Sequence, residues 1–376
     1  MADQMAQSPT MLKERPRTPE ERAAEVAEAL AGAAAARADG DRDVAVRVIE
    51  QQLRSGTWRQ PRLWAARVTL MESPQEYADV RELWLNSGKS AHSSVAVLRL
   101  VARAAAISGV HDEARALLRK AIREQDRLRR RPRQVLRRRR EQVAQLLPAR
   151  SPSASATDSG FQGGATRALD EFNGLLAQHD VRPYLISGTL LGLVRDGGFI
   201  TWDKDIDVGV HSQEVEMPRL VEIFERDPAF ELRRLDFTSD RLRVHHASSQ
   251  VGIDVFPHYR DEDDPDLVWH DGAATRWWNS PFDLAEREFL GQSVWVPEQP
   301  ERYLDENYGD WRTPDSVFDA RLDAPNVEIT NQDYFDTLLY FSLLTAIRQD
   351  KAAKRERYAA MLRELGEGSW VERVGR

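Results

Sequence analysis

The stretch YLISGTLLGLVRDGGFITWDKDIDVGV, from Tyr184 to Val210, decides the fold of the second half of this 376-residue chain. A short apolar run leads into a small helix that ends at glycines, and a strand-like DIDVGV follows. Side chains alternate between the two faces of a strand, so Asp203, Asp205 and Asp207 are predicted to share one face. The aliphatic side chains between and after them are predicted to face the core.

The acids Asp205 and Asp207 form a candidate metal site. Two residues apart on a strand, they would lie about 6.6–7 Å apart. Oxygen ligands without cysteine or clustered histidine favour Mg²⁺ or Mn²⁺ over Zn²⁺. The alternative is an acidic turn or a solvated strand edge, because a bare Asp-x-Asp is common.

A third acid supports the metal interpretation. In the apolar run SQVGIDVFPHY, which begins at Ser249, Val251, Ile253 and Val255 share one face of a predicted strand, and Asp254 lies on the other. An acid on a strand next to the first two could complete a metal shell or take a proton from an attacking hydroxyl.

Polar residues around these acids are candidates for weaker roles. The Ser187-Gly188-Thr189 turn opens a helix, where backbone N–H groups could bind phosphate oxygens, although Ser187 could also be an ordinary N-cap. Two histidines, His245 and His246, lie on a predicted strand near the third acid. One of them could face the site, and the alternative is an ordinary pair of strand histidines.

The first half of the chain follows a helical pattern instead. Three similar stretches begin at Gly40, Ser73 and Gly109, with a period of about 34 residues that resembles tetratricopeptide repeats. A plain helical bundle is the alternative. After it come nine arginines between Arg127 and Arg140, which indicate either a contact with an anionic partner or a solvated helix end.

These patterns predict an α+β (mixed α/β) chain in which an all-α helical-repeat domain precedes a mixed-sheet domain. We expect a disordered N-terminus, a helical domain, a flexible linker, a catalytic domain, and C-terminal helices that pack on the catalytic domain. The expected boundaries are 1–16, 17–148, 149–164, 165–315 and 316–376.

SGTLLGLVRDGGFITWDKDIDVGV, followed by GIDVFPHY and by LGQSVWVPEQPERYLDENYGDWRTP, resembles the LicD family, which includes fukutin and fukutin-related protein. The resemblance covers roughly residues 163–315. It departs from the family at Lys204, where another Asp is frequent, and at His258-Tyr259, where another acid is common. The cysteines that bind zinc in animal members are also absent.

The resemblance implies a nucleotidyltransferase-like fold and a metal-dependent phosphotransferase. Family members move a phosphorylated alcohol, such as phosphocholine or ribitol phosphate, from a CDP-activated donor to a glycan hydroxyl. Carried over, Asp205 and Asp207 would bind Mg²⁺ or Mn²⁺, with Asp203 in the same motif and Asp254 as the third acid. The Ser187 turn and Arg195 would match donor-phosphate contacts, unless Arg195 only pairs with Asp203.

Composition narrows the remaining choices. The chain has no cysteine, which excludes disulfides, thiol nucleophiles and cysteine-ligated zinc. Residues 1–150 carry a net charge of +10 and the rest −18. With no apolar leader or membrane-length run, we expect a cytoplasmic protein, with peripheral association at the inner membrane face as a further option.

The expected partners follow from the leading interpretation. They are a CDP-activated alcohol, a glycan or lipid-linked glycan acceptor, and a protein or anionic membrane at the basic half. No nucleic acid is expected, because no aromatic residues interleave with the arginines. Two alternatives are a nucleotidyltransferase acting on a small molecule, and a helical-repeat interaction protein with an inactive transferase domain.

Overall fold

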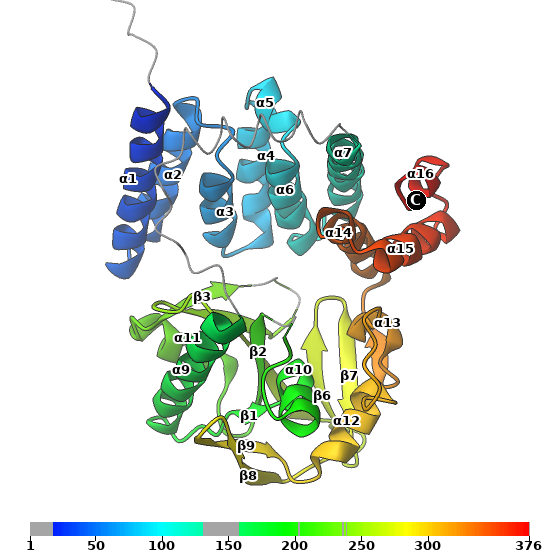
Figure 1. Ribbon diagram of the computed structural model, residues 1–376. Helices are drawn as coiled ribbons and strands as arrows, with labels where there is room; N and C mark the ends of the chain where they lie inside the picture. Colours follow the sequence, from blue (N-terminus) through cyan, green and yellow to red (C-terminus); the bar gives the residue numbers. More distant parts are fainter. Residues whose placement is uncertain (1–17, 131–157, 202–203, 235–236, 238, 376) are drawn as a thin grey trace, which may run out of the picture.

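The computed structural model describes residues 18–130, 158–201, 204–234, 237 and 239–375. The predicted disordered N-terminus, most of the predicted linker, and the arginines from Arg131 onward lie outside this described part. The rest forms a helical layer and a mixed β-sheet, which lie one against the other (Figure 1). Arg37 of the helical layer donates a hydrogen bond to the carbonyl of Leu232 in the sheet, at 3.1 Å.

The helical layer is a row of packed helices. In chain order these are α1 (Pro19–Ala38), α2 (Arg42–Arg54), α3 (Pro61–Thr69), the short η1 (Pro74–Glu76), α4 (Tyr77–Leu85), α5 (Lys89–His92), α6 (Val95–Ile107) and α7 (His111–Arg129). A capping box of Thr18 and Glu21 begins the row. Gly40 and Gly109, which precede α2 and α7, both adopt a positive φ near 78°, as glycine does at helix ends. The all-α prediction is confirmed, whereas assignment to the tetratricopeptide class stays a prediction.

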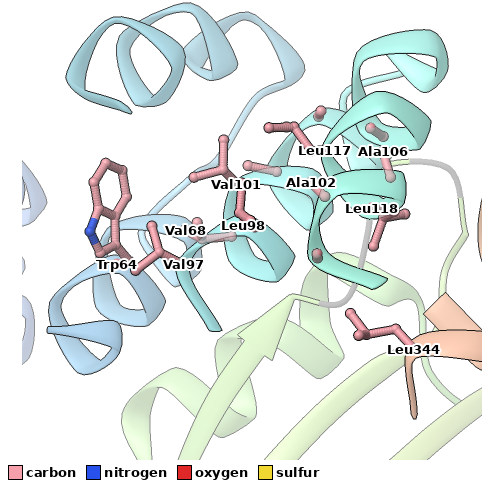
Figure 2. Packing of buried hydrophobic residues seen from close by; sticks show 14 of the residues in the cluster. Trp64, Val68, Val97, Leu98, Val101, Ala102, Ala106, Leu117, Leu118 and Leu344 are labelled. Atoms are coloured by element: carbon pink, nitrogen blue, oxygen red, sulfur yellow. The ribbon is translucent and has the colours of Figure 1, made fainter. Parts of the chain in front are cut away.

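The C-terminal helices join this helical layer. α14 (Gln332–Arg348) packs on α7, and α15 (Ala352–Glu364) and α16 (Trp370–Gly375) follow it (Figure 1). Leu344 of α14 lies in the same apolar cluster as Leu117 and Leu118 of α7 (Figure 2). α14 therefore departs from the prediction that the C-terminal helices pack on the catalytic domain, because its apolar face extends the helical core.

The sheet combines parallel and antiparallel pairs. Its strands are β1 (Tyr184–Leu185), β2 (Asp205–His211), β3 (Phe230–Arg234), β4 (Leu242–His246), β5 (Gly252–Arg260), β6 (Val268–Gly272), β7 (Thr275–Asn279), β8 (Leu284–Phe289), β9 (Gln292–Pro297) and β10 (Val327–Ile329). The strand order is β10-β7-β6-β5-β2-β1-β9-β8, with β4 beside β5 and β3 beside β4. The pairs β2–β5 and β1–β9 are parallel. The predicted mixed sheet is confirmed.

The central strand β5 changes neighbours along its length. It pairs with β2 from Gly252 to His258, with β4 up to Val255, and with β6 from Tyr259 onward. Pro257 lies in the gap between these two antiparallel partners, where its missing N–H breaks no bond to either of them. Asp254 and Phe256, which lie on the same face of β5, both line a cavity.

Helices cover the apolar face of the sheet. Phe172 of α9 (Asp158–Ala177) stacks on Phe224 of α11 (Met217–Arg226), with ring centroids 5.5 Å apart. Because α9 already begins at Asp158, the predicted linker ends earlier than residue 164. The sheet also extends past the predicted boundary at residue 315, since β10 pairs with β7.

The other side of the sheet carries short elements. They are α10 (Ser187–Leu191), its continuation η2 (Gly192–Asp196), α12 (Pro300–Tyr308) and α13 (Ala320–Asp323). Among the described helices, none combines the length and apolarity needed to cross a bilayer.

Candidate active site

Two predicted acids meet in the middle of the sheet. Asp207 of β2 and Asp254 of β5 are register partners in a parallel pair, and Asp205 stands beside Gly252. The intervening Ile206 is fully buried on the opposite, helix-covered face. The alternation predicted for both strands is therefore confirmed. Asp203 lies outside the described residues.

An arginine that the sequence analysis did not single out links these acids. Arg243 of β4 is the antiparallel register partner of Asp254. Its Nε donates to Asp254 Oδ1, and its Nη2 donates to Asp254 Oδ2 at 2.6 Å and to Asp205 Oδ2 at 2.5 Å. Arg243 belongs to the strand that was predicted around His245 and His246. Its register with the strand of Asp254 was the missing information.

The first residues of α10 form hydrogen bonds with Asp207 of β2. The Gly188 N–H donates to Asp207 Oδ2 at 3.2 Å, and the Asp207 N–H donates to Thr189 Oγ1 at 2.9 Å. Ser187 has a φ of 47°, a strained value for a residue other than glycine. The Asp207 carboxylate thus occupies the Gly188 N–H in this structure, and the predicted phosphate contact of the Ser187-Gly188-Thr189 turn stays a prediction. The buried Thr189 hydroxyl likewise serves β2.

A cavity of about 430 Å³ opens beside the acids. Asp207 and Asp254 line it together with the start of α10, the β6–β7 hairpin, α12, α13 and one residue of α14. The C-terminal segments thus close one side of the cavity even though most of α14 packs in the helical layer. The lining residues are Ser187, Gly188, Asp207, Arg241, Asp254, Phe256, His270, Ala273, Trp277, Asn307, Tyr308, Asp319, Ala320, Arg321 and Leu338.

Two polar side chains at this cavity have unused hydrogen-bonding groups. Arg241 forms none of the ion pairs found in the described part of the chain, and its buried Nε has no hydrogen-bond partner there. His270 is 3% exposed, and both of its ring nitrogens lack a partner among the described residues. Burial, and then the charges of Arg241 and Arg276, lower the pKa of His270 to about 3. Buried polar atoms without partners are rare in folded proteins, and a ligand is one explanation for them. Sequence reasoning missed both residues.

The remaining predicted site residues have other partners. Arg195 pairs with Asp196 through two 2.9 Å hydrogen bonds and donates to the Trp311 carbonyl at 3.4 Å. It does not line the cavity, so the predicted phosphate contact stays a prediction. The alternative, a pair with Asp203, lies outside the described residues. The adjacent side chain of Asp196 captures the guanidinium.

The two histidines of β4 point to opposite faces. His246 is buried and contacts Glu171 Oε2 at 2.9 Å and Ser249 Oγ at 2.8 Å, which marks it as structural. His245 is on the same face as Arg243, beside Gly252. Burial, followed by the charges of Arg233 and Arg243, lowers the pKa of His245.

The chemistry of the acids fits a hard divalent cation, because all their donor atoms are carboxylate oxygens. The positions of these carboxylates, however, do not form a complete set of metal ligands. Across the described residues, no group of three or more His, Cys, Asp or Glu side chains is placed to hold a metal ion. The guanidinium of Arg243 occupies the space between Asp205 and Asp254 instead.

Part of the chain is similar to known proteins. Residues 180–299 match the family described as LicD/FKTN/FKRP, nucleotidyltransferase domain. The mouse ribitol-5-phosphate transferase fukutin is 28% identical over 153 residues, which cover 39% of this chain and 32% of fukutin. The lipopolysaccharide cholinephosphotransferase LicD of Haemophilus influenzae is 41% identical over 56 residues, 15% of this chain and 20% of that protein.

A bacterial protein of uncharacterized function also matches. The Rickettsia prowazekii protein RP689 is 24% identical over 143 residues, 36% of this chain and 51% of its own length. The chain thus spans about a third of fukutin and about half of the rickettsial protein. The matched family region contains β2, β4 and β5, and therefore the acids and Arg243.

Proposed function

Residues 180–299 of this chain form a LicD-family nucleotidyltransferase domain, and from this premise we propose that the protein is a metal-dependent phosphotransferase. The proposed reaction moves a phosphorylated alcohol, such as ribitol phosphate or phosphocholine, from a CDP-activated donor to a glycan hydroxyl. The similarity to fukutin, a ribitol-5-phosphate transferase, and to LicD, a cholinephosphotransferase, supports this choice of transferred groups.

One observation carries the proposal. Asp207 and Asp254, on neighbouring parallel strands, both line a cavity of about 430 Å³. A cavity of this size lies within the range that small-molecule ligands occupy. Acids that line a cavity are suited to a substrate whose negative phosphates come with a divalent cation.

The proposed chemistry can be written bond by bond. The acceptor hydroxyl oxygen forms a bond to the phosphorus that bears the alcohol, and the bond from that phosphorus to the bridging oxygen of CMP breaks. CMP leaves with the electron pair, and solvent takes up the hydroxyl proton. A bound Mg²⁺ or Mn²⁺ would neutralise charge on the phosphates.

The residues of the chain have separate roles in this proposal. We assign Asp205 and Asp207 to cation binding and Arg241 to a donor phosphate, because Arg241 faces the cavity without an acidic partner in the described part. Asp254 accepts hydrogen bonds on both oxygens from Arg243. We therefore assign Asp254 to fixing the charge of the site rather than to taking the acceptor proton.

The direct test is a donor panel. The purified chain is incubated with CDP-ribitol, CDP-choline or CDP-glycerol, a glycan acceptor and Mg²⁺, and the released nucleotide is identified by chromatography. The proposal expects CMP with at least one donor and none after chelation by EDTA. Pyrophosphate release from a nucleoside triphosphate, without CMP release from any CDP-alcohol, would support the nucleotidyltransferase alternative instead.

The helical layer and the location of the protein belong to the same proposal. We propose that the basic N-terminal half brings the catalytic domain to a glycan carrier or a partner protein at the cytoplasmic membrane face. Its support is the +10 charge of residues 1–150. Loss of vesicle binding when Arg127, Arg129 and Arg130 are replaced by Gln would test the membrane version.

A further inference from the structure

The space between the metal-site acids already holds a positive charge. Arg243 is tied to both oxygens of Asp254 and to one oxygen of Asp205. Its guanidinium thus bridges an acid of β2 and an acid of β5, which belong to neighbouring strands. We infer that Arg243 serves as a fixed second cation of this centre, so that the site binds a single divalent ion.

This inference rests on the proposed function, and charge is its first argument. The carboxylates of Asp205, Asp207 and Asp254 carry three negative charges, and the guanidinium of Arg243 neutralises one of them. Arginine keeps its charge at every physiological pH. The two negative charges that remain match one divalent ion. Without Arg243, the same acids would have the charge and the oxygens to attract a second.

Space is the second argument. Two-metal phosphoryl-transfer sites hold their ions about 3.5–4 Å apart, bridged by shared carboxylates. Here the bridging position between Asp205 and Asp254 is filled by the Arg243 Nη2, at 2.5 Å and 2.6 Å from their oxygens. Both oxygens of Asp254 already accept from Arg243, and Asp207 lies at the cavity, where one of its oxygens accepts from Gly188.

The fold holds the arginine in place. Arg243 and Asp254 face each other in an antiparallel pair whose neighbouring residues are also paired. The Asp254 side chain is 6% exposed, and that of Arg243 is 28% exposed. Moving the guanidinium away would leave a buried carboxylate without its partner, which is strongly unfavourable. A cation that binds at Asp205 and Asp207 therefore meets Arg243 as a resident neighbour.

Metal-binding stoichiometry tests the inference without any turnover. Calorimetric titration with Mn²⁺, and electron paramagnetic resonance of the bound ion, would be applied to the wild type, Arg243→Met and Arg243→Lys. The wild type should bind one Mn²⁺. Arg243→Met should bind a second Mn²⁺, coupled to the first, and hold the first about tenfold tighter or more. Arg243→Lys retains the charge and should still bind one.

Controls separate this reading from loss of structure. Arg357→Met removes an arginine of similar exposure, 29%, from its pair with Asp323 of α13 and should leave Mn²⁺ binding unchanged. Thermal unfolding and circular dichroism would establish that each variant is folded. If Arg243→Met does not fold, Arg243→Gln, which also removes the charge, takes its place.

The outcomes are distinct. Two ions in the wild type, two ions in Arg243→Lys, or a folded Arg243→Met that binds one ion with unchanged or weaker affinity would overturn the inference. Absence of Mn²⁺ binding in the wild type and in both variants would overturn the metal dependence in the proposed function, and the inference with it. One ion in the wild type with no CMP release from any donor would leave the inference standing while the proposed reaction fails.

Discussion

Asp207 and Asp254 lie side by side in the parallel pair of β2 and β5, each at the same cavity. Two segments far apart in the sequence thus supply one acidic centre. Arg243, from the third adjacent strand, compensates part of this charge through Asp254 and Asp205. The centre is therefore a mixed cation and carboxylate arrangement before any ligand binds.

Arg241 is expected to bind a donor phosphate. Charge-assisted hydrogen bonds contribute about 1.5–3 kcal/mol, so Arg241→Gln should weaken CDP binding about 10- to 150-fold. Calorimetric titration with CDP would measure the change. The exposed Arg260, on the outer end of β5, provides a matched control, and Arg260→Gln should bind CDP like the wild type. Equal affinity in the two variants would contradict the assignment.

His270 is expected to contact the nucleotide as a neutral side chain. Its imidazole is buried against Phe256 and Trp277, with both ring centroids 5.3 Å away, and its lowered pKa of about 3 keeps it uncharged at neutral pH. His270→Phe fills the same space and removes polar atoms without partners. Its melting temperature should equal or exceed that of the wild type, while CDP affinity should fall about 2- to 10-fold. An unchanged affinity, measured by calorimetry, would exclude the contact.

Much of this centre could be predicted from local pattern. Alternation alone placed Ile206 in the core and Asp205 and Asp207 on the other face, and it separated Asp254 from Ile253. The family resemblance joined these segments before their pairing was known. Alternation succeeds because strand periodicity is a short-range property of the chain.

What could not be predicted depends on long-range pairing. Arg243 became a partner of Asp254 only through the β4–β5 register, which no local pattern specifies. The apolar face of α14 fits a catalytic domain or a helical layer equally well until its neighbour α7 is known. Arg195 was assigned by motif position, and its nearest acid, Asp196, decided its actual partner.

Leu344 is expected to stabilise the helical layer. It is fully buried next to α7, although it lies more than two hundred residues further along the chain (Figure 2). Leu344→Ala should cost about 2–5 kcal/mol of unfolding free energy, because it opens a cavity in a packed core. The exposed Leu85 of α4 is the control, and Leu85→Ala should cost about 0.5 kcal/mol or less. Urea unfolding measures both, and similar losses would contradict the placement of α14.

Glu367 is expected to make stability depend on acidic pH. Burial raises the pKa of Glu367, but hydrogen bonds from Tyr340, Arg119 and Trp370 outweigh burial and bring this pKa below its usual value. A carboxyl whose folded pKa is lowered stabilises the fold above its usual pKa of 4.5, and this contribution is lost as the pH falls through the lower folded value.

The corresponding variant is Glu367→Gln. The free energy of unfolding of this variant should be about 1–3 kcal/mol lower than that of the wild type at pH 7, because the substitution breaks a half-buried hydrogen-bond network between α7, α14 and α16. The difference in melting temperature from the wild type should shrink as the pH falls below 4.5. Glu364→Gln, at an exposed position of α15, should match the wild type across this range. A difference in melting temperature that grows as the pH falls would show that folding does not lower the pKa of Glu367.

The most direct test of the account is the rate of CMP release from a CDP-alcohol with Mg²⁺, compared between Asp207→Asn and Asp263→Asn. Asp263 is an exposed acid on the loop after β5 and lies outside the cavity. Loss of a cation-binding carboxylate removes several kcal/mol of transition-state stabilisation, so Asp207→Asn should slow release about a hundredfold or more. Asp263→Asn should leave the rate unchanged. An Asp207→Asn protein that folds normally and releases CMP at the wild-type rate would contradict the central claim that Asp207 and Asp254 lie at the catalytic centre.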